Sequence, residues 1–336
     1  MSIKFLLFSD FHYSKKRYPI TVNDLEKILK RGHDENVDFV LQGGDFCVDA
    51  LDSPEIFEAL LNNKFNLPVY GVCGNHELEI LGNTMDFITP RLCNREVNKP
   101  HPDASYWYFD IDKFRFIGLD TNYSYDPVAK VWEHVQSGNT MGKPGNTNLA
   151  CMCPEEWDWY INLLDDAKEK GLKVITFSHH ALSGCFNFNC GNAPEIREIL
   201  PDYKHTAVMF INGDLHAEYY AVIEDVVFYS MTSSRYLDSN RERKPAYPED
   251  ATFEYFDYDE NGNLRGSYQK PYTSLTQPWN YYCDEPISAI VTINDDGIVT
   301  IDGFTSNWMY GITPVNNQLQ HPHEPYIVNR KFKLDF

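Results

Sequence analysis

The order of apolar and helical segments in the first third of the chain restricts the fold more than any other sequence feature. Apolar runs at 3–8, 37–41 and 68–73 indicate buried strands, and the segments at 21–35 and 54–62 between them indicate helices. Strands that are joined by a helical crossover are expected to lie parallel in one sheet. Because ligand-binding groups in such sheets gather beyond the carboxyl ends of the strands, the residues just after each run are the first candidates for a functional site.

The remainder of the chain mixes strands with one clear helix. That helix is expected at about 154–170, beginning at Pro154 and ending at Gly171. Residues 122–153 contain Gly, Asn and Pro without a clean period, which predicts an insertion or a lid-like loop. Further strands are expected at about 105–110, 114–119, 173–178, 206–212, 218–224, 226–231, 252–258, 264–270, 287–294 and 298–303.

Composition and charge limit the possible classes of protein. Of the 336 residues, 43% are hydrophobic and 23% are charged, which excludes disordered and collagen-like chains. The net charge of −20 weighs against a large nucleic-acid interface, because phosphate backbones are bound mainly by Lys and Arg. Apolar stretches are shorter than the ~18 residues of a membrane span, and the N-terminal run is too short for a secretory signal. We therefore expect a soluble, cytoplasmic protein that does not interact with membranes.

The eight cysteines leave two interpretations open. Free thiols in a reducing cytoplasm are the first, since an even number of cysteines does not by itself imply disulfides in a chain of this length. In the second, Cys151-x-Cys153 and Cys185-x4-Cys190 form a small thiolate zinc site or a disulfide pair.

Five of the expected strands are followed at once by residues that can bind metal ions. These segments are Asp10-x-His12, Gly44-Asp45, Gly74-Asn75-His76-Glu77, His179-His180 and Asp214-x-His216. Each segment alone is a weak signal, but all five follow strands on what should be one edge of the sheet. Mixed carboxylate, amide and imidazole donors suit Mn, Fe or Zn rather than an ion that selects thiolates.

These segments resemble the signature of the calcineurin-like metallophosphoesterase superfamily, in which Asp-x-His, Gly-Asp, Gly-Asn-His-Glu or Gly-Asn-His-Asp, His and Gly-His-x-His follow one another. The resemblance spans roughly residues 3–235. It implies an α/β (α+β) four-layer sandwich, in which two mixed β-sheets are flanked by helices and a metal site lies at the strand ends. We expect residues 1–235 to form this domain and residues 236–336 to form a β-rich C-terminal extension packed on it.

The resemblance also implies which residues bind two divalent metal ions. The first ion would be bound by Asp10, His12, Asp45 and His216. The second ion would share Asp45 and would also be bound by Asn75, His179 and the residue at position 214. His76 would be the proton donor beside the leaving group, since imidazole titrates near neutral pH.

Position 214 departs from the family pattern, because Gly213-Asp214-Leu215-His216 stands where the family has Gly-His-x-His. The Asp214 carboxylate can still reach the second ion, and it would favour Mn, Fe(II) or Mg over Zn. Alternatively, Asp214 does not bind metal and the second site is weak or empty. His179 fits the family position better than His180, which then supports the site or contacts the substrate.

We expect a hydrolase of phosphomonoesters or phosphodiesters of small molecules. A nuclease of the same superfamily is opposed by the acidic charge, and a non-catalytic scaffold or binding protein is opposed by the retention of six of seven metal positions together with His76. Arg235 is the candidate for contact with a phosphate oxygen, with Arg241, Arg243 and Lys244 close to it in sequence. Trp132, Trp157 and Trp159 either stack on an aromatic leaving group or serve packing.

Overall fold

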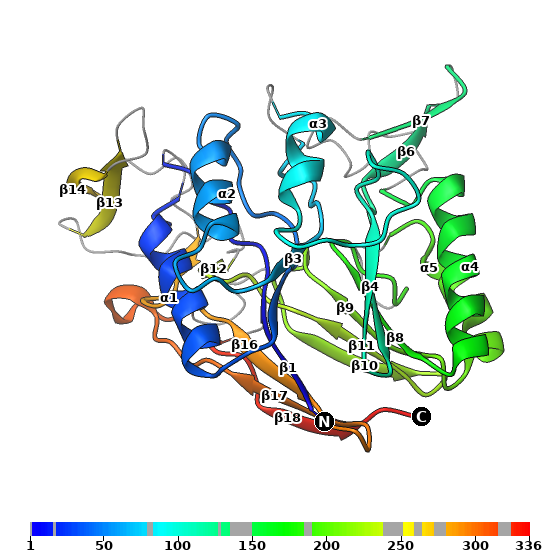
Figure 1. Cartoon of the computed structure of the whole chain (residues 1–336). Coiled ribbons are helices and arrows are strands. Elements are labelled where there is room, and N and C mark those ends of the chain that lie inside the picture. Colours follow the sequence, from blue (N-terminus) through cyan, green and yellow to red (C-terminus); the bar gives the residue numbers. More distant parts are fainter. Residues whose placement is uncertain are drawn as a thin grey trace.

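The centre of the computed structural model consists of two six-stranded β-sheets that lie face to face, with helices on their outer sides (Figure 1). The described residues are 2–15, 18–78, 83–126, 129–134, 150–184, 190–237, 251–258, 264–271, 280–314 and 324–336.

The first sheet combines the beginning of the chain with its last strands. Its order is β18-β17-β16-β1-β2-β3, with β1, β2 and β3 parallel and β16, β17 and β18 joined by antiparallel pairing. The strands are β1 (Ile3–Phe8), β2 (Phe39–Gln42), β3 (Val69–Gly71), β16 (Ala289–Ile293), β17 (Ile298–Gly303) and β18 (Arg330–Lys333).

The second sheet has four parallel strands in its centre and an antiparallel strand at each edge. Its order is β10-β11-β9-β8-β5-β4. The strands are β4 (Trp107–Ile111), β5 (Phe114–Gly118), β8 (Lys173–Ser178), β9 (Ala207–Asn212), β10 (Tyr219–Ile223) and β11 (Val226–Ser230).

The two longest helices have clear end signals. In α1 (Val22–Asp34) the side chain of Thr21 accepts a hydrogen bond from the Asp24 backbone and Asp24 reciprocates, which forms a capping box. Pro154 begins α4 (Pro154–Lys170), and Gly171, with a φ of 70°, ends it. The others are α2 (Ser53–Leu61), α3 (Met85–Ile88), α5 (Ala193–Ile199) and the 3₁₀ turns at Thr89–Arg91, Leu200–Tyr203 and Met309–Gly311.

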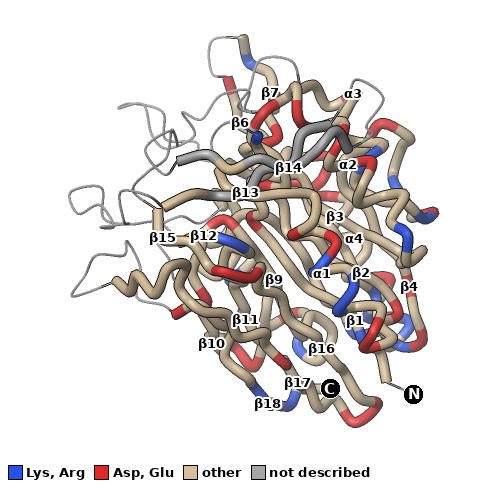
Figure 2. The backbone as a smooth tube through the Cα atoms, turned by 90° about the vertical axis from the view of Figure 1, so that its left-hand side faces the viewer, with Lys and Arg blue, Asp and Glu red and all other residues tan. Residues whose placement is uncertain are grey.

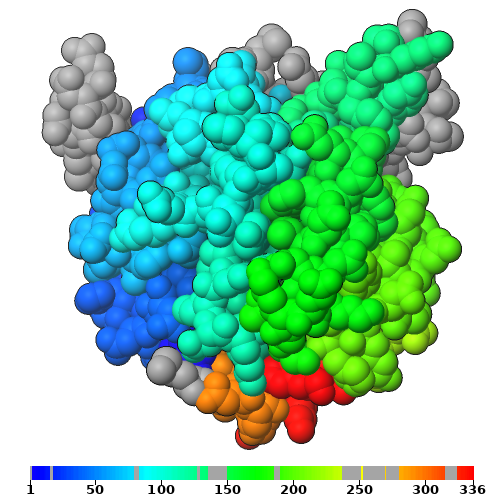
Figure 3. Space-filling view, turned by 45° about the vertical axis from the view of Figure 1, so that its right-hand side comes forward, coloured from blue at the N-terminus to red at the C-terminus, as the bar shows by residue number. Residues whose placement is uncertain are grey.

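Three two-stranded ribbons complete the described part of the chain. The hairpin of β6 (Tyr123–Asp126) and β7 (Val131–His134) projects above the body of the molecule (Figures 1 and 3). The other two ribbons are β12 (Tyr236–Leu237) with β15 (Tyr281–Tyr282), and β13 (Thr252–Tyr258) with β14 (Leu264–Pro271).

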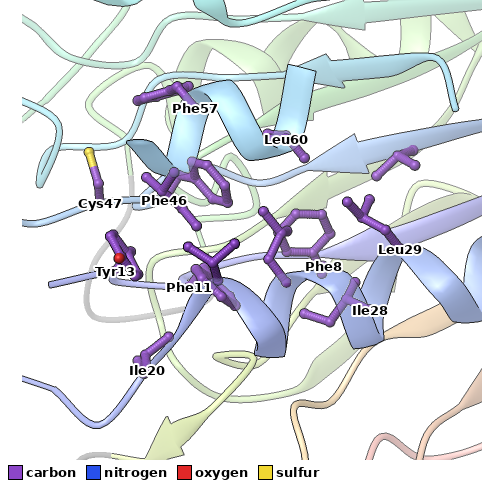
Figure 4. Close-up of a cluster of buried hydrophobic side chains, with 14 of the residues drawn as sticks. Phe8, Phe11, Tyr13, Ile20, Ile28, Leu29, Phe46, Cys47, Phe57 and Leu60 are labelled. Atoms are coloured by element: carbon purple, nitrogen blue, oxygen red, sulfur yellow. The ribbon is translucent and has the colours of Figure 1, made fainter. Parts of the chain in front are cut away.

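Successive side chains of β1 point to opposite faces of the first sheet and so contribute to two different cores. Phe5 and Leu7 face the core between the two sheets, whereas Leu6 and Phe8 face the core beneath α1 and α2. Figure 4 shows this outer core, in which Phe8 lies among side chains from α1, α2 and the loops after the strands. A third core packs α4 and α5 on the second sheet. Because β1 is apolar on both faces, the polar residues that follow it are held by a strand that is buried on both sides.

The four-layer arrangement of two mixed sheets flanked by helices confirms the predicted fold class. Strands β16, β17 and β18 pair with β1 and with one another, so the β-rich end of the chain forms part of the first sheet. The division at residue 235 stays a prediction. Of the expected lid at 122–153, the described residues form the β6–β7 hairpin and the approach to α4, and residues 127–128 and 135–149 lie outside the described part of the chain.

The cysteines and the charges add two observations. Seven cysteines are free thiols, and Cys185 lies outside the described residues. Lys and Arg are interspersed with Asp and Glu along the described backbone (Figure 2). Among the described helices, no segment combines the length and the apolar character needed to cross a bilayer.

Candidate metal centre

The five predicted segments meet at the carboxyl ends of strands from both sheets, where β1, β2, β3, β8 and β9 end. Their backbone conformation is unusual, since positive φ is rare for residues other than glycine and, where it recurs, tends to mark functional sites. The positive φ angles are 51° at Asp10, 53° at His12, 51° at Asp45, 65° at Asp214 and 49° at His216. These sharp turns direct the chain so that several side chains converge on one region.

The first group of donors consists of Asp10, His12, Asp45 and His216, all buried, whose ligand atoms lie within 4.8 Å of one another. The Nε2 atoms of His12 and His216 are only 3.0 Å apart. His12 Nε2 lies 3.5 Å from Asp45 Oδ2, and His216 Nε2 lies 3.3 Å from Asp10 Oδ1. Two imidazole nitrogens that face each other between buried carboxylates fit a shared cation, and these are the four residues expected at the first metal site.

The second group is centred on His179, which is fully buried. Its Nδ1 lies 2.7 Å from the carbonyl oxygen of Gly43, which only accepts, so Nδ1 carries the hydrogen. Its Nε2 then faces three oxygens, at 3.1 Å from Asn75 Oδ1, 3.3 Å from Asp45 Oδ1 and 3.7 Å from Asp214 Oδ1. Such an Nε2 atom must either carry a proton or face a cation, and metal-binding histidines usually donate their other N–H to a carbonyl in this way.

The electrostatics of the second group point in the same direction. Burial alone would lower the pKa of His179, but the carboxylates of Asp45, Asp10 and Asp214 together outweigh it and raise this pKa well above its usual range. Burial raises the pKa of Asp214 to about 6. Buried carboxylates in such proximity are costly unless a positive charge balances them. The position that faces these oxygens therefore strongly favours a cation.

Asp45 links the two groups. Its Oδ2 is the oxygen 3.5 Å from His12, and its Oδ1 is the oxygen 3.3 Å from His179. The Asp45 side chain is 2% exposed and is held in place from the third strand's loop, because the His76 backbone N–H donates to Oδ1 at 2.8 Å. A close approach of the two loops requires glycine at 74, where a Cβ would lie 2.2 Å from the Asp45 nitrogen.

The His76 side chain differs from the expected ligands in its accessibility. It is 26% exposed, and its Nε2 lies 3.8 Å from Asp45 Oδ2. Its ring centroid is 4.6 Å from that of His12. His76 thus lies beside the donor groups with part of its ring open to solvent.

His180 and Asp214 also lie in this region. With His179 they form a second set of ligand atoms within 4.8 Å of one another. His180 Nδ1 is 2.8 Å from Thr121 Oγ1, and burial lowers the pKa of His180 to about 3. Asp214 is positioned by its own backbone N–H, which donates to the Asp10 carboxylate at 3.1 Å.

A sequence model of calcineurin-like phosphoesterases matches residues 3–218, which is more than half of the chain. The chain belongs to the calcineurin-like phosphoesterase family. Membership in this family implies a phosphoesterase of the hydrolase class with a dinuclear centre of divalent metal ions, and the two donor groups are the candidate site for it. The resemblance inferred from the sequence is thereby confirmed.

One solved structure shows that the fold is shared, and a second has a more distant likeness. A dimetal phosphatase from Danio rerio superimposes with a TM-score of 0.55 at 14% identity, over 90% of this chain and 95% of that one. A purple acid phosphatase from yellow lupin (Lupinus luteus) seeds aligns with a TM-score of 0.44 at 12% identity, over 94% of this chain and 53% of that one. No curated protein sequence matches the chain.

In this member of the calcineurin-like phosphoesterase family, Glu77 organises the site although sequence reasoning gave it no role. Its carboxylate accepts hydrogen bonds from the backbone N–H groups of four residues that belong to two loops. The donors are Gly74 at 2.7 Å, Asp45 at 3.0 Å, Phe46 at 2.5 Å and Cys47 at 3.0 Å. Burial and the charge of Asp45 raise the pKa of Glu77 to about 7, while the N–H donors act in the opposite direction.

Two further features of the site were not expected. The ring of Tyr236 packs against His12 and His216, with centroids 5.2 and 5.1 Å away, and Tyr18 stacks on Tyr236 at 4.9 Å. The loop Asp120–Asn122 follows β5 at the same edge of the second sheet. A polar residue two positions after a strand was the signal that could have identified Asp120, but the family signature does not include it.

Arg235 is engaged away from the two donor groups. Its guanidinium donates to the carbonyl oxygens of Cys283 and Asp284, and its Nε lies 3.7 Å from Asp24 Oδ2. The Ser233 hydroxyl donates to the Asp10 carbonyl oxygen at 2.8 Å. Residues 233–235 thus support the backbone, and a contact of Arg235 with substrate stays a prediction, while Arg241, Arg243 and Lys244 lie outside the described residues.

The three tryptophans near the expected lid have different environments. Trp157 and Trp159 pack against the core beneath α4, as the packing interpretation expects. Trp132, on β7, is 39% exposed and contacts the ring of Tyr125 at 5.5 Å. Trp132 therefore has an exposed surface on the hairpin that projects beside the site.

Proposed function

We propose that the protein hydrolyses phosphate esters of small molecules, either monoesters or diesters, with two divalent metal ions. The observation that carries this proposal is the position of Asp45, whose two oxygens face two different groups of donors. A carboxylate that bridges two cations screens their mutual repulsion and is what a dinuclear site needs. The family membership of the chain supports the same chemistry.

The proposed ligands fall into two sets that share one residue. The first ion would be held by Asp10, His12, Asp45 and His216, and the second by Asp45, Asn75, His179 and Asp214. When bound, a pair of divalent ions polarises the phosphoryl oxygens and makes water a better nucleophile. Carboxylate, amide and imidazole donors suit Mn or Fe first and Zn second, and Asp214 adds weight to the harder ions.

The proposed role of His76 follows from its place beside Asp45. A departing alkoxide needs a proton. The His76 imidazole is partly exposed and lies beside Asp45, so it can supply this proton to a substrate bound at the site. Asp45 orients His76 through the 2.8 Å hydrogen bond from the His76 backbone. One hydrogen bond between the loops after β2 and β3 thus connects the proposed proton donor with the proposed bridging carboxylate.

The proposed substrate is small for reasons of charge. The net charge of −20 opposes a long polyanion, whereas one phosphate group can be attracted by two bound cations. His180 lies next to His179 at the second donor group and is the candidate for contact with the substrate. We place the protein in the cytoplasm, where its free thiols would remain reduced.

The decisive experiment combines metal analysis with a screen of phosphate esters in the presence of Mn²⁺. The wild-type protein should contain about two ions per chain when saturated, and it should release phosphate or alcohol from at least one ester class. Asp45→Asn should lose activity and metal at both sites, because it removes the shared charge. Asp110→Asn, which removes a carboxylate that pairs with Arg115 on the second sheet, is the matched control. Wild-type turnover by Asp45→Asn would refute the two-metal assignment.

A further inference from the structure

The β6–β7 hairpin is connected to the body of the molecule through a buried carboxylate. His134, the last residue of β7, places its Nε2 2.9 Å from Asp120 Oδ2. The ring of His134 also packs on Tyr123 at the start of β6, with centroids 4.0 Å apart. Figures 1 and 3 show that this hairpin projects above the body of the molecule. The contact therefore links an element at the surface with the loop after β5.

Asp120 is fully buried and has partners on every side. Ser105 donates to the same oxygen as His134, and the backbone and side chain of Asn122 donate to the other oxygen at 3.0 Å. Burial opposes ionisation, but His134 and these donors lower the pKa of Asp120 to about 2, so His134 Nε2 carries the hydrogen. The Asp120 backbone N–H donates to Glu156 Oε1 on α4 at 2.7 Å. Asp120 thus joins the loop after β5 to α4 and to the β6–β7 hairpin.

That loop contacts two of the four chain segments that carry the proposed ligands of the second ion. The Asn122 side chain donates to the carbonyl oxygen of Cys73 at 2.8 Å, two residues before Asn75. Thr121 Oγ1 lies 2.8 Å from His180 Nδ1 and accepts a hydrogen bond from the His180 backbone at 3.2 Å. His180 directly follows His179. Residues 120–122 therefore connect the loops that carry Asn75 and His179, two of the proposed ligands of the second ion.

We propose that Asp120 and His134 are positioning residues for the second metal ion, and that the β6–β7 hairpin controls the affinity of that site through them. The inference rests on the proposed function, because it assumes that Asn75 and His179 bind the second ion. The ligands that belong to the first ion alone, Asp10, His12 and His216, lie on the loops after β1 and β9, so we expect the effect mainly at the second site. Partners that orient metal ligands typically change metal affinity by ~10- to 100-fold.

The test uses two substitutions that separate the hydrogen bond of His134 from its packing. His134→Phe keeps an aromatic ring against Tyr123 but cannot donate to Asp120, whereas His134→Gln can donate but has no ring. Glu133→Gln, which changes the exposed neighbour of His134 on the same strand, is the control. Mn²⁺ binding by equilibrium dialysis gives the two dissociation constants, and electron paramagnetic resonance distinguishes a spin-coupled pair of ions from a single ion.

The expected result is a second dissociation constant that rises by ~10- to 100-fold in His134→Phe, with the first unchanged. In His134→Phe the signal of the spin-coupled ion pair should weaken at limiting Mn²⁺ and return in excess Mn²⁺. The dissociation constants of His134→Gln and Glu133→Gln should stay close to those of the wild type. If His134→Phe does not fold, Asp120→Asn is measured instead and should weaken the second ion in the same way. An unchanged second constant overturns this inference while leaving the proposed function intact. A wild-type protein that binds fewer than two ions overturns the proposed function itself.

Discussion

The side chains of the candidate metal centre also suit the backbone conformations that place them. Asp10, Asp45 and Asp214 have positive φ angles, and so do His12 and His216. Aspartate and histidine adopt this left-handed conformation more readily than most residues, and they are also hard and borderline metal donors. A single choice of residue type thus satisfies a tight turn after a strand and supplies a ligand atom.

The role of His76 can be separated from metal binding. We expect His76→Gln to keep about two metal ions per chain while lowering kcat by ~10²–10⁴-fold, the usual scale of general acid catalysis. The loss should be smaller for nitrophenyl esters, because their leaving groups depart without a proton. Steady-state kinetics with paired alkyl and nitrophenyl esters, together with metal analysis, make the measurement. Equal losses for both leaving groups would point to orientation rather than proton donation.

Asp214 is the residue at which this chain departs from its family, and its replacement tests the metal preference. We expect Asp214→His to stay active with a higher relative activity in Zn²⁺, since imidazole suits Zn²⁺ better than a carboxylate does. Asp214→Ala should lose the second ion and most of the turnover. The measurement is activity in Mn²⁺ and Zn²⁺ beside metal content. Asp214→Ala with two tightly bound ions and normal turnover would show that Asp214 is not a ligand.

At the level of the elements, Glu77 joins the loops after β2 and β3 through four backbone N–H groups. Glu77→Gln replaces one acceptor oxygen by an NH₂ group that faces these donors. We expect the free energy of unfolding to fall by about 1–3 kcal/mol, the usual effect of unsatisfied buried polar groups. Urea unfolding in excess chelator isolates this effect from metal binding. Glu58→Gln on the exposed side of α2 is the control, and an equal change in both variants would contradict the role of Glu77.

The sequence predicted elements best where the pattern is local. Helix α4 was expected at 154–170 and has those bounds, and β1 was expected at 3–8. The ligand candidates were found for the same reason, because each follows a strand directly. Glu77 and His134 act through contacts that depend on how distant loops meet, so no local pattern indicates their roles. Asp120 follows β5 closely, but it lies outside the family signature. The pairing of β16 with β1 was equally invisible, since the two strands are far apart in sequence.

At the level of the whole molecule, β16, β17 and β18 supply half of the first sheet. A chain that ends at residue 235 would leave the edge of β1 unpaired and remove apolar residues such as Val291 and Ile301 from the core between the sheets. We expect this fragment to lack a cooperative thermal transition and to aggregate. Circular dichroism melts and size-exclusion chromatography of the fragment and the full chain make the comparison. A fragment that unfolds cooperatively and binds metal like the full chain would show that residues 1–235 form an independent domain.

The neighbours of β1 also determine when the site can form during synthesis. Leu7 pairs with Ala289, so the partner strand leaves the ribosome about 280 residues later. At ~5–20 residues per second this delay lasts roughly 15–60 s. Throughout that interval the nascent chain presents an apolar strand with one open edge, which exposes it to chaperones and to aggregation. Asp10 and His12 follow this strand directly, so the nascent protein should acquire its metal ions only after β16 has been made.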